Sequence, residues 1–388
     1  MVKSEQPILY MDHAATSWPK PEQVWVAMEK AMREEGANPG RGGHMMASRA
    51  GKRLMKARMA IAELLHVRNP MDIAFMLNTT MALNTALHGY LESGDHVIAT
   101  SVEHNSVSRP LEWLKQEKGI NVTYIDTLPS GEMDLNQLEA AWTAKTKLVV
   151  CNHSSNVLGS ILPIAEIAML AHDKGAKILV DAAQSAGYLP LDVEQMGIDM
   201  LAFPGHKGLL GPTGTGGLYI HPDIELRPLM QGGTGSHSDS VQHPITRPDR
   251  YEAGTPNTVG IAGLEAGVRF LLHETIENIY TKEWTLTQQL LQGFDAMTGV
   301  QWLGPDIGQA RTGIVSITVE GMDAAACAFR LDRDYGIAVR AGYHCSPLAH
   351  QTAGTLNEGA VRFSVGWNTT SEHINYALET VEHLCKKG

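Results

Sequence analysis

Short apolar runs recur through the middle of the chain, and patterns typical of helices separate them. Four runs are apolar at successive positions instead of alternating positions, which is typical of strands buried on both faces of a sheet. One helical pattern between them has the expected start and stop residues, Pro163 and Gly175. The predicted strands are "HVIAT" (96–100), "KLVVCN" (147–152), "KILVDA" (177–182) and "DMLAFPG" (199–205), and the helices include "LNQLEAAW" and "PIAEIAMLAHDKG".

Strands and helices that alternate in this order predict an α/β fold with a mainly parallel sheet and crossover helices. Each predicted strand also runs into a polar cluster, and these clusters are "SVEHNS", "NHSSN", "DAAQS" and "GHKG". In open α/β sheets, ligands bind outside the carboxyl ends of the strands. We therefore expect the four clusters to meet around one site.

The chain changes character after about residue 265. The later segment contains a long helical pattern, a strand candidate and a final helix, which are "TKEWTLTQQLLQGFDAM", "GIVSITVEG" and "SEHINYALETVEHLCKK". We expect a large domain over residues 20–264 and a smaller α+β domain that combines residues 265–388 with residues 1–19. The Gly-rich stretches "GPTGTGG" and "MQGGTGSHSDS" are predicted to be loops or tight turns.

Composition and charge narrow the classes of function. The chain has 388 residues, of which 43% are hydrophobic and 19% charged, enough for a large core. The net charge of -11 comes without a block of Lys or Arg, which argues against nucleic acid or anionic lipid as a partner. No run of about eighteen apolar residues and no apolar leader are present, so we expect a cytoplasmic protein.

Four cysteines are too few and too scattered for a disulfide framework or a structural zinc site, so a functional cysteine is expected to act as a free thiol. Cys151 and Cys327 lie in apolar stretches and are interpreted as core residues, and Cys385 lies near the end of the chain. Cys345 differs, because "RAGYHCSPLAH" (340–350) places it between two histidines and after an arginine. Cationic neighbours favour the thiolate, which is the attacking species.

Two residues at predicted strand ends point to cofactor chemistry. Lys207 directly follows a buried strand, where partial desolvation lowers the pKa of a lysine and makes it a candidate nucleophile toward an aldehyde. The alternative is a surface lysine on a turn. Asp181 ends another strand, where a carboxylate requires a partner such as the protonated nitrogen of a pyridine ring, although an aspartate that caps a turn is common.

The order of motifs along nearly the whole chain resembles the class V aminotransferase-type enzymes of the fold type I pyridoxal phosphate superfamily. Within that group it is similar to the group II cysteine desulfurases and selenocysteine lyases. Each motif is short, but their number and order are specific. The motifs are "YMDHAATSWPKP", "ANPGRGGH", "NTTMALN", "SVEHNS", "SNVLG", "VDAAQSAG", "FPGHKGLLGPTGTG", "YEAGTPNT", "RAGYHCSP" and "VRFSVGWNT".

The resemblance implies pyridoxal 5'-phosphate as the cofactor. It assigns Lys207 to the covalent attachment of the cofactor, Asp181 to its pyridine nitrogen and Gln184 to its ring oxygen. His104 would stack on the ring and carry protons, although a histidine at a strand end is more commonly structural. Asn156 would lie near the ring oxygen and the substrate carboxylate.

The phosphate of such a cofactor requires several hydrogen-bond donors, which a helix N-terminus supplies through its main-chain amides. Thr79 and Thr80 precede a helical pattern and meet this requirement, and the same residues can also cap the helix. The resemblance adds His206 as a donor, and it adds Thr255 from the partner subunit of a homodimer. Pro204 departs from the family pattern, in which a serine that bonds the phosphate is usual, so either another donor compensates or cofactor affinity is lower.

In the same pattern, a cysteine at position 345 takes the sulfur of L-cysteine as a persulfide, and L-alanine is released. Arg362 matches the arginine that holds the substrate carboxylate, and Arg340 assists it, orients the loop or is simply solvated. A protein that accepts the sulfur is a further expected partner. Tyr343 stands in place of the usual histidine and Met81 in place of a glutamate, which leaves the substrate range open.

Three alternatives remain at this point. A selenocysteine lyase shares these residues but does not require Cys345, because selenium can leave without attack by a thiol. Another class V enzyme, such as an aminotransferase or an epimerase, forms no persulfide. A protein that retains the fold and only binds a partner needs neither the thiol nor Lys207.

Overall fold

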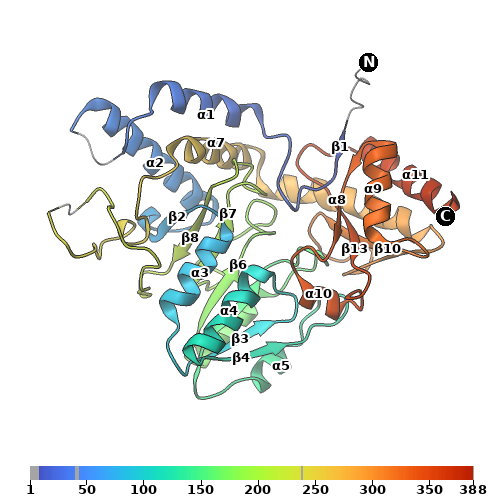
Figure 1. Cartoon of the computed structure of the whole chain (residues 1–388), viewed down its shortest axis with the longest axis horizontal. Coiled ribbons are helices and arrows are strands. Elements are labelled where there is room, and N and C mark those ends of the chain that lie inside the picture. The colour runs from blue at the N-terminus through green and yellow to red at the C-terminus, as the bar shows by residue number, and fades with distance from the viewer. Residues whose placement is uncertain (1–7, 40–42, 237–238, 388) are drawn as a thin grey trace.

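The computed structural model of the chain describes residues 8–39, 43–236 and 239–387. Figure 1 shows a large sheet with its helices on one side of the molecule and a smaller sheet with α8 (Ile276–Asp295), α9 (Ala324–Tyr335) and α11 (Ser371–Lys387) on the other. Residues 1–7 of the expected small domain lie outside the described residues. The same applies to residues 40–42 of "ANPGRGGH" and to residues 237 and 238 of the second Gly-rich stretch.

The large sheet has seven strands in the order β2-β8-β7-β6-β5-β3-β4. β8 runs antiparallel to β2 and β7, and the other neighbouring pairs are parallel, which confirms the mainly parallel α/β sheet predicted from the sequence. The strands are β2 (Ile73–Met76), β3 (His96–Thr100), β4 (Asn121–Ile125), β5 (Thr146–Asn152), β6 (Lys177–Asp181), β7 (Met200–Pro204) and β8 (Gly216–Ile220).

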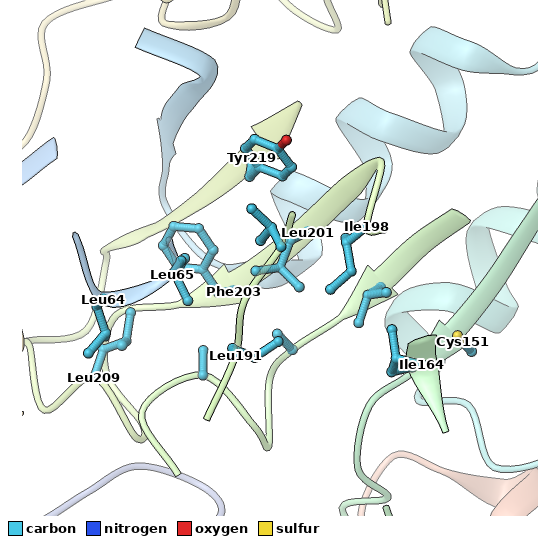
Figure 2. Close-up of a cluster of buried hydrophobic side chains, with 14 of the residues drawn as sticks. Leu64, Leu65, Cys151, Ile164, Leu191, Ile198, Leu201, Phe203, Leu209 and Tyr219 are labelled. Atoms are coloured by element: carbon cyan, nitrogen blue, oxygen red, sulfur yellow. The ribbon is translucent and has the colours of Figure 1, made fainter. Parts of the chain in front are cut away.

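Successive residues of each buried strand point to opposite faces of the sheet, so both faces are apolar. Helices cover both of them. Val149 belongs to a hydrophobic cluster with α2, α6 and α7, and Val150 to a second cluster with α3 and α4. Figure 2 shows part of the first cluster, which includes Phe203 from β7 and Leu65 at the end of α2. The helices of this part are α1 (Glu22–Glu34), α2 (Met45–Leu64), α3 (Thr79–Tyr90), α4 (Asn105–Lys118), α5 (Leu135–Ala140), α6 (Ile164–Asp173) and α7 (Thr258–Glu274), with short 3-10 turns at Pro70–Asp72 and Asp249–Tyr251.

The smaller sheet is antiparallel and has the order β12-β13-β10-β9, and β1 pairs with β11 beside it. A third hydrophobic cluster joins Met11 to side chains of the C-terminal part of the chain. The expected domain boundary at residue 264 falls inside α7, and the two-domain division stays a prediction. The remaining elements are β1 (Leu9–Tyr10), β9 (Val300–Trp302), β10 (Ile314–Val319), β11 (Ile337–Ala338), β12 (Arg340–Gly342), α10 (Pro347–Thr352) and β13 (Ala360–Ser364).

The stretch "GPTGTGG" is a loop only in part, because its last two glycines begin β8. A Cβ atom on Gly217 would lie 2.4 Å from the ring of Phe203, and one on Gly216 would lie 2.6 Å from the Phe203 carbonyl oxygen. Close pairing of β8 with β7 therefore requires glycine at both positions. Among the described helices, none is both long and apolar enough to cross a membrane.

Candidate active site

The carboxyl ends of the parallel strands open into a cavity of about 190 Å³. The polar clusters that follow β3, β5, β6 and β7 all contribute to its wall, as the sequence predicts, and the start of α3 joins them. The lining residues are Asn78, Thr79, Thr80, His104, Ser106, Asn152, Ser154, Asn156, Asp181, Ala183, Gln184, His206 and Lys207.

A larger cleft, of about 570 Å³, lies at the opposite ends of the same strands. Its buried acid, Asp199, accepts hydrogen bonds from His172, Lys177 and the main-chain N–H of Ile178 at 2.7 to 2.9 Å. The charges there already have partners within the protein. The smaller cavity beside Lys207 contains groups that lack partners, and it is therefore the candidate site.

Lys207 and Asp181 both line the cavity, and the charge of Asp181 affects the pKa of Lys207. Burial lowers the pKa of Lys207 to about 8, and the negative charge of Asp181 acts in the opposite direction. Burial raises the pKa of Asp181 to about 6. The main-chain N–H of Ala183 donates to the Asp181 Oδ1 at 2.9 Å, and within the described residues no other hydrogen bond reaches this carboxylate. Asp181 therefore has the capacity to bind a further cationic group.

The ring of His104 is fixed at the start of α4. Its Nδ1 accepts a hydrogen bond of 3.0 Å from the main-chain N–H of Ser106, so the neutral ring carries its proton on Nε2. Burial and the positive charges of Lys207 and Arg340 lower the pKa of His104 to about 4. The ring is consequently neutral near pH 7. The Ser106 hydroxyl also bonds Thr80 at 2.8 Å, which links the starts of α3 and α4.

The other end of the cavity is formed by the start of α3 and by His206. The side chain of Asn78 accepts from the Met81 N–H at 2.9 Å and caps α3, whereas the first N–H groups of a helix have no acceptor within it. The Nδ1 atom of His206 is buried and has no hydrogen-bond partner among the described residues. These groups, with the hydroxyls of Thr79 and Thr80, suit an anion such as a phosphate.

The donor set as a whole fits pyridoxal phosphate. A buried carboxylate with one hydrogen bond suits a protonated pyridine nitrogen, an amine with a lowered pKa suits an aldehyde, and the start of α3 with the unpartnered His206 Nδ1 suits a phosphate. Gln184 also lines the cavity, and its Nε2 donates to the Ala14 carbonyl at 2.9 Å.

Two positions that the resemblance relates to the phosphate site, Thr255 and Pro204, do not line the cavity of this chain. Thr255 is exposed and does not line the cavity of its own chain, and its hydroxyl accepts from the Asn38 side chain at 3.4 Å. Pro204 is buried in β7 opposite Gly216 and also does not line the cavity. The lower cofactor affinity that Pro204 would cause without a compensating donor therefore stays a prediction.

Cys345 lies in the short loop between β12 and α10, and its side chain is exposed, whereas Cys151 and Cys327 are buried as expected. The main-chain N–H of Asn105 donates to the Cys345 carbonyl at 2.8 Å, which holds the loop beside His104. A guanidinium nitrogen of Arg340 lies 3.4 Å from the sulfur. The loop from the smaller sheet thus lies beside His104, which lines the cavity, although Cys345 itself is not one of the lining residues.

Arg340 and Arg362 are directly opposite each other on β12 and β13, so both side chains point to the same face. Arg362 is 1% exposed and donates to the Asn156 carbonyl at 3.0 Å and to Asp12 Oδ1 at 2.9 Å. Its Nε is buried and finds no partner in the part of the chain that the structure describes. Burial and the charge of Arg340 lower the pKa of Arg362, and the charge of Asp12 opposes this shift. The two arginines carry two positive charges, and Asp12 is one carboxylate. The pair can therefore bind a second carboxylate, supplied by a ligand.

Sequence reasoning missed several residues of this site. Asp12 belongs to the motif "YMDHAATSWPKP", but its pairing with Arg362 spans 350 residues. Asn152 and Ser154 belong to the polar cluster "NHSSN" and were detectable from their place at a strand end. Ser346 precedes Pro347 and carries no signal in the sequence for its contact with the site, in which its hydroxyl donates to Asn156 Oδ1 at 2.7 Å.

Comparisons with known proteins agree with this geometry. The family model described as aminotransferase class-V matches residues 9–376. A probable cysteine desulfurase of Methanothermobacter thermautotrophicus is 36% identical over 100% of this chain and 98% of its own length. A cysteine desulfurase of Enterobacter sp. is 33% identical over 97% of this chain and 94% of its own length.

Solved structures give the same result. The apo structure of a cysteine desulfurase from Thermococcus onnurineus superposes with a TM-score of 0.92 at 33% identity, and covers 98% of this chain and 95% of its own. A cysteine desulfurase from Escherichia coli superposes with a TM-score of 0.89 at 27% identity, over 98% of this chain and 95% of its own.

Proposed function

The chain belongs to the class V aminotransferase family and to the cysteine desulfurases within it, and we propose that it converts L-cysteine to L-alanine while the sulfur passes to Cys345 as a persulfide. The observation that supports this most is the hydrogen bond from the Asn105 N–H to the Cys345 carbonyl, which holds an exposed thiol beside His104. A buried structural cysteine such as Cys151 or Cys327 does not expose its thiol.

The proposed cofactor is pyridoxal 5'-phosphate, on which enzymes of this family depend. When bound, it supplies an electron sink for the negative charge left by removal of the Cα proton of an amino acid. Lys207 would hold it through its amine, Asp181 through the ring nitrogen and Gln184 through the ring oxygen. The phosphate would be bound by the residues at the start of α3 and by His206.

The substrate carboxylate would bind Arg362 with help from Arg340, because these two cations share one face and, within the described part of the chain, have one carboxylate partner between them, Asp12. Asn156 would lie beside it, since its carbonyl accepts from Arg362. The Nζ atom of Lys207 would take the Cα proton, for which a pKa of about 8 is well suited. His104 would carry a proton on Nε2.

Sulfur transfer is balanced without an external oxidant. The Cys345 thiolate attacks the sulfur of L-cysteine, an S–S bond forms and the C–S bond breaks. The electron pair of the C–S bond stays with the carbon, which is protonated to become the methyl group of alanine. L-Cysteine and one thiol therefore give L-alanine and one persulfide.

The assembly is part of the same proposal. We propose a homodimer in which Thr255 reaches the phosphate site of the partner subunit, because it is exposed and lies away from the cavity of its own chain. We also propose a protein that accepts sulfur from Cys345, whose exposed side chain permits access. The cytoplasmic location rests on the sequence alone.

The direct test uses the purified protein loaded with pyridoxal phosphate and supplied with L-cysteine. The proposal predicts alanine formation that Cys345→Ala abolishes and that Cys327→Ala, a cysteine buried in the hydrophobic cluster of the smaller sheet, retains. Alanine formation from L-cysteine that persists in Cys345→Ala would contradict the persulfide route. If Cys345→Ala loses activity with L-cysteine but not with L-selenocysteine, sulfur but not selenium requires the thiol.

A further inference from the structure

The side chain of Asn156 bridges the two residues that flank Cys345. Its Nδ2 donates to the His344 carbonyl at 2.8 Å, and its Oδ1 accepts from the Ser346 hydroxyl at 2.7 Å. His344 and Ser346 are both buried, whereas the cysteine between them is exposed. One amide group therefore anchors the loop on both sides of the thiol.

Ser346 occupies the N-cap position of α10, where a serine hydroxyl normally accepts from a main-chain N–H of the helix. In this helix no such hydrogen bond forms, and Pro347 follows at the first helical position. The Ser346 hydroxyl points instead to Asn156, and the residue is 0% exposed. The hydroxyl is thus available for a role other than starting the helix.

The loop between the anchors has an unfavourable backbone conformation. His344 has φ of 52° and Cys345 has φ of 59°, so two successive residues other than glycine are left-handed. Such conformations cost on the order of 1–3 kcal/mol each and persist only where surrounding contacts hold them. The Cys345 carbonyl is held by Asn105 and the His344 carbonyl by Asn156, so loss of either contact favours relaxation of the turn.

The main chain around Asn156 is itself fixed by the smaller sheet. Four successive carbonyls, from residue 156 to residue 159, accept hydrogen bonds from four different residues of the C-terminal part: Arg362, Ser316, Arg311 and Thr312. The main freedom left to Asn156 is rotation of its amide group. The His344 carbonyl can only accept, so it requires Nδ2, and the remaining Oδ1 requires a donor.

We propose that Ser346 is a positioning residue for sulfur transfer. By donating to Asn156 Oδ1, it keeps Nδ2 on the His344 carbonyl and thereby holds Cys345 in its left-handed turn at the rim of the cavity. Without the hydroxyl, Oδ1 becomes a buried acceptor without a partner, and rotation of the amide releases the loop. This inference rests on the proposed function, because it explains how the thiol is presented to the substrate.

The Asn105 amide provides a readout that does not depend on activity. Asn105 is the first residue of α4, so its N–H has no acceptor within the helix and donates to the Cys345 carbonyl instead. Its rate of hydrogen–deuterium exchange therefore reports how often the loop leaves its docked position. In the loaded enzyme, Ser346→Ala is expected to speed this exchange about fivefold to tenfold, as loss of one net hydrogen bond implies.

Ser316→Ala is the matched control. Ser316 is also 0% exposed and donates from its hydroxyl to the neighbouring carbonyl of Val157 at 2.6 Å, but it does not contact the loop. Without this hydroxyl, the carbonyls of residues 156, 158 and 159 still accept from Arg362, Arg311 and Thr312, so the main chain around Asn156 stays in place.

Ser316→Ala should leave Asn105 exchange and the rate of persulfide formation in a single turnover near wild-type values. Ser346→Ala should slow persulfide formation by about the same factor as it speeds hydrogen–deuterium exchange at the Asn105 amide. Exchange of the amides in the middle of α4 should not change, which verifies that the variant is folded.

A double variant tests whether Ser346 acts through Asn156. Once Asn156→Ala has removed the amide, Ser346→Ala should not speed Asn105 exchange further. If the Asn105 amide exchanges in Ser346→Ala at the same rate as in wild type or in Ser316→Ala, the inference is overturned. A wild-type enzyme that forms no persulfide would overturn the proposed function instead, and Asn105 exchange would still decide whether Ser346 holds the loop.

Discussion

The main-chain N–H of Asn105 donates a hydrogen bond to the carbonyl of Cys345 at 2.8 Å. This contact ties the loop of the smaller sheet to the start of α4, next to His104. The loop is short, because β12 ends at Gly342 and α10 begins at Pro347. Proline restricts the backbone further, so the thiol is expected to stay at the cavity instead of carrying sulfur to a distant acceptor.

A thiol held in this way makes persulfide release slow. We predict that the first equivalent of alanine appears in a burst when L-cysteine is the only thiol present. The slower phase that follows should accelerate with a strong reductant or a dedicated sulfur acceptor. Rapid-quench measurement of alanine checks this, and linear release from the first turnover that no acceptor changes would show that an earlier step is limiting.

The pKa of Lys207 predicts how cofactor loading depends on pH. Burial lowers this pKa to about 8, and the neutral amine is the form that reacts with an aldehyde. Stripped enzyme should therefore bind pyridoxal phosphate faster as the pH rises through about 8 and reach a plateau above it. Stopped-flow absorbance measures the rate.

Asp181→Asn is the companion variant for this experiment. The negative charge of Asp181 raises the pKa of Lys207, against the effect of burial. Removal of that charge should shift the midpoint of the loading profile to lower pH. A midpoint that stays in place or moves to higher pH would show that the two groups do not interact as the geometry implies.

Glu103 predicts a pH dependence of stability. It is 0% exposed, its Oε1 accepts from the Asn152 N–H at 2.9 Å, and its Oε2 is buried with no partner in residues 8–39, 43–236 and 239–387. Burial raises its pKa from 4.5 to about 8, so the folded protein holds a proton that the unfolded chain releases. The stability from this proton is complete below pH 4.5 and is lost as the pH rises through about 8.

Glu103→Gln mimics the protonated acid and should remove this loss. The free energy of unfolding in urea, measured at several pH values, should fall less for the variant than for wild type between about pH 5 and pH 9. Parallel curves for the two proteins would mean that Glu103 is ionised in the folded state.

Arg362 predicts the recognition of the substrate carboxylate. Arg362→Lys keeps a cation for Asp12 but loses the planar fork of the guanidinium. The KM for L-cysteine should rise about 10- to 100-fold, as expected for ~1.5–3 kcal/mol from a hydrogen bond to a charged group. The inhibition constant of cysteamine, which has no carboxylate, should not change. If Arg362→Lys weakened the binding of L-cysteine and of cysteamine equally, the carboxylate of L-cysteine would bind at another residue.

The parts of the structure that follow from the sequence are those with a periodic or positional signal. The apolar runs predicted β3, β5, β6 and β7, and the polar clusters after them predicted that His104, Asp181 and Lys207 line one cavity. These predictions succeed because the carboxyl ends of parallel strands share one edge of a sheet.

Contacts between polar side chains far apart in the chain carry no such signal. Ser346 and Asn156 are separated by 190 residues, and nothing in either segment specifies that they pair. The same holds for Asp12 and Arg362. The strand position of Gly217 was equally hidden, because it follows from the ring of Phe203 on the neighbouring strand.

In the proposed reaction, Cys345 takes the sulfur of L-cysteine. The most direct test is mass spectrometry of the loaded enzyme after incubation with L-cysteine, with alanine quantified in the same sample. The account predicts one additional sulfur atom on the peptide that carries Cys345, about one equivalent of alanine in the first turnover, and neither product with Lys207→Ala. Unmodified Cys345 in a sample that contains no alanine, or alanine without a sulfur adduct at any time point, would contradict it.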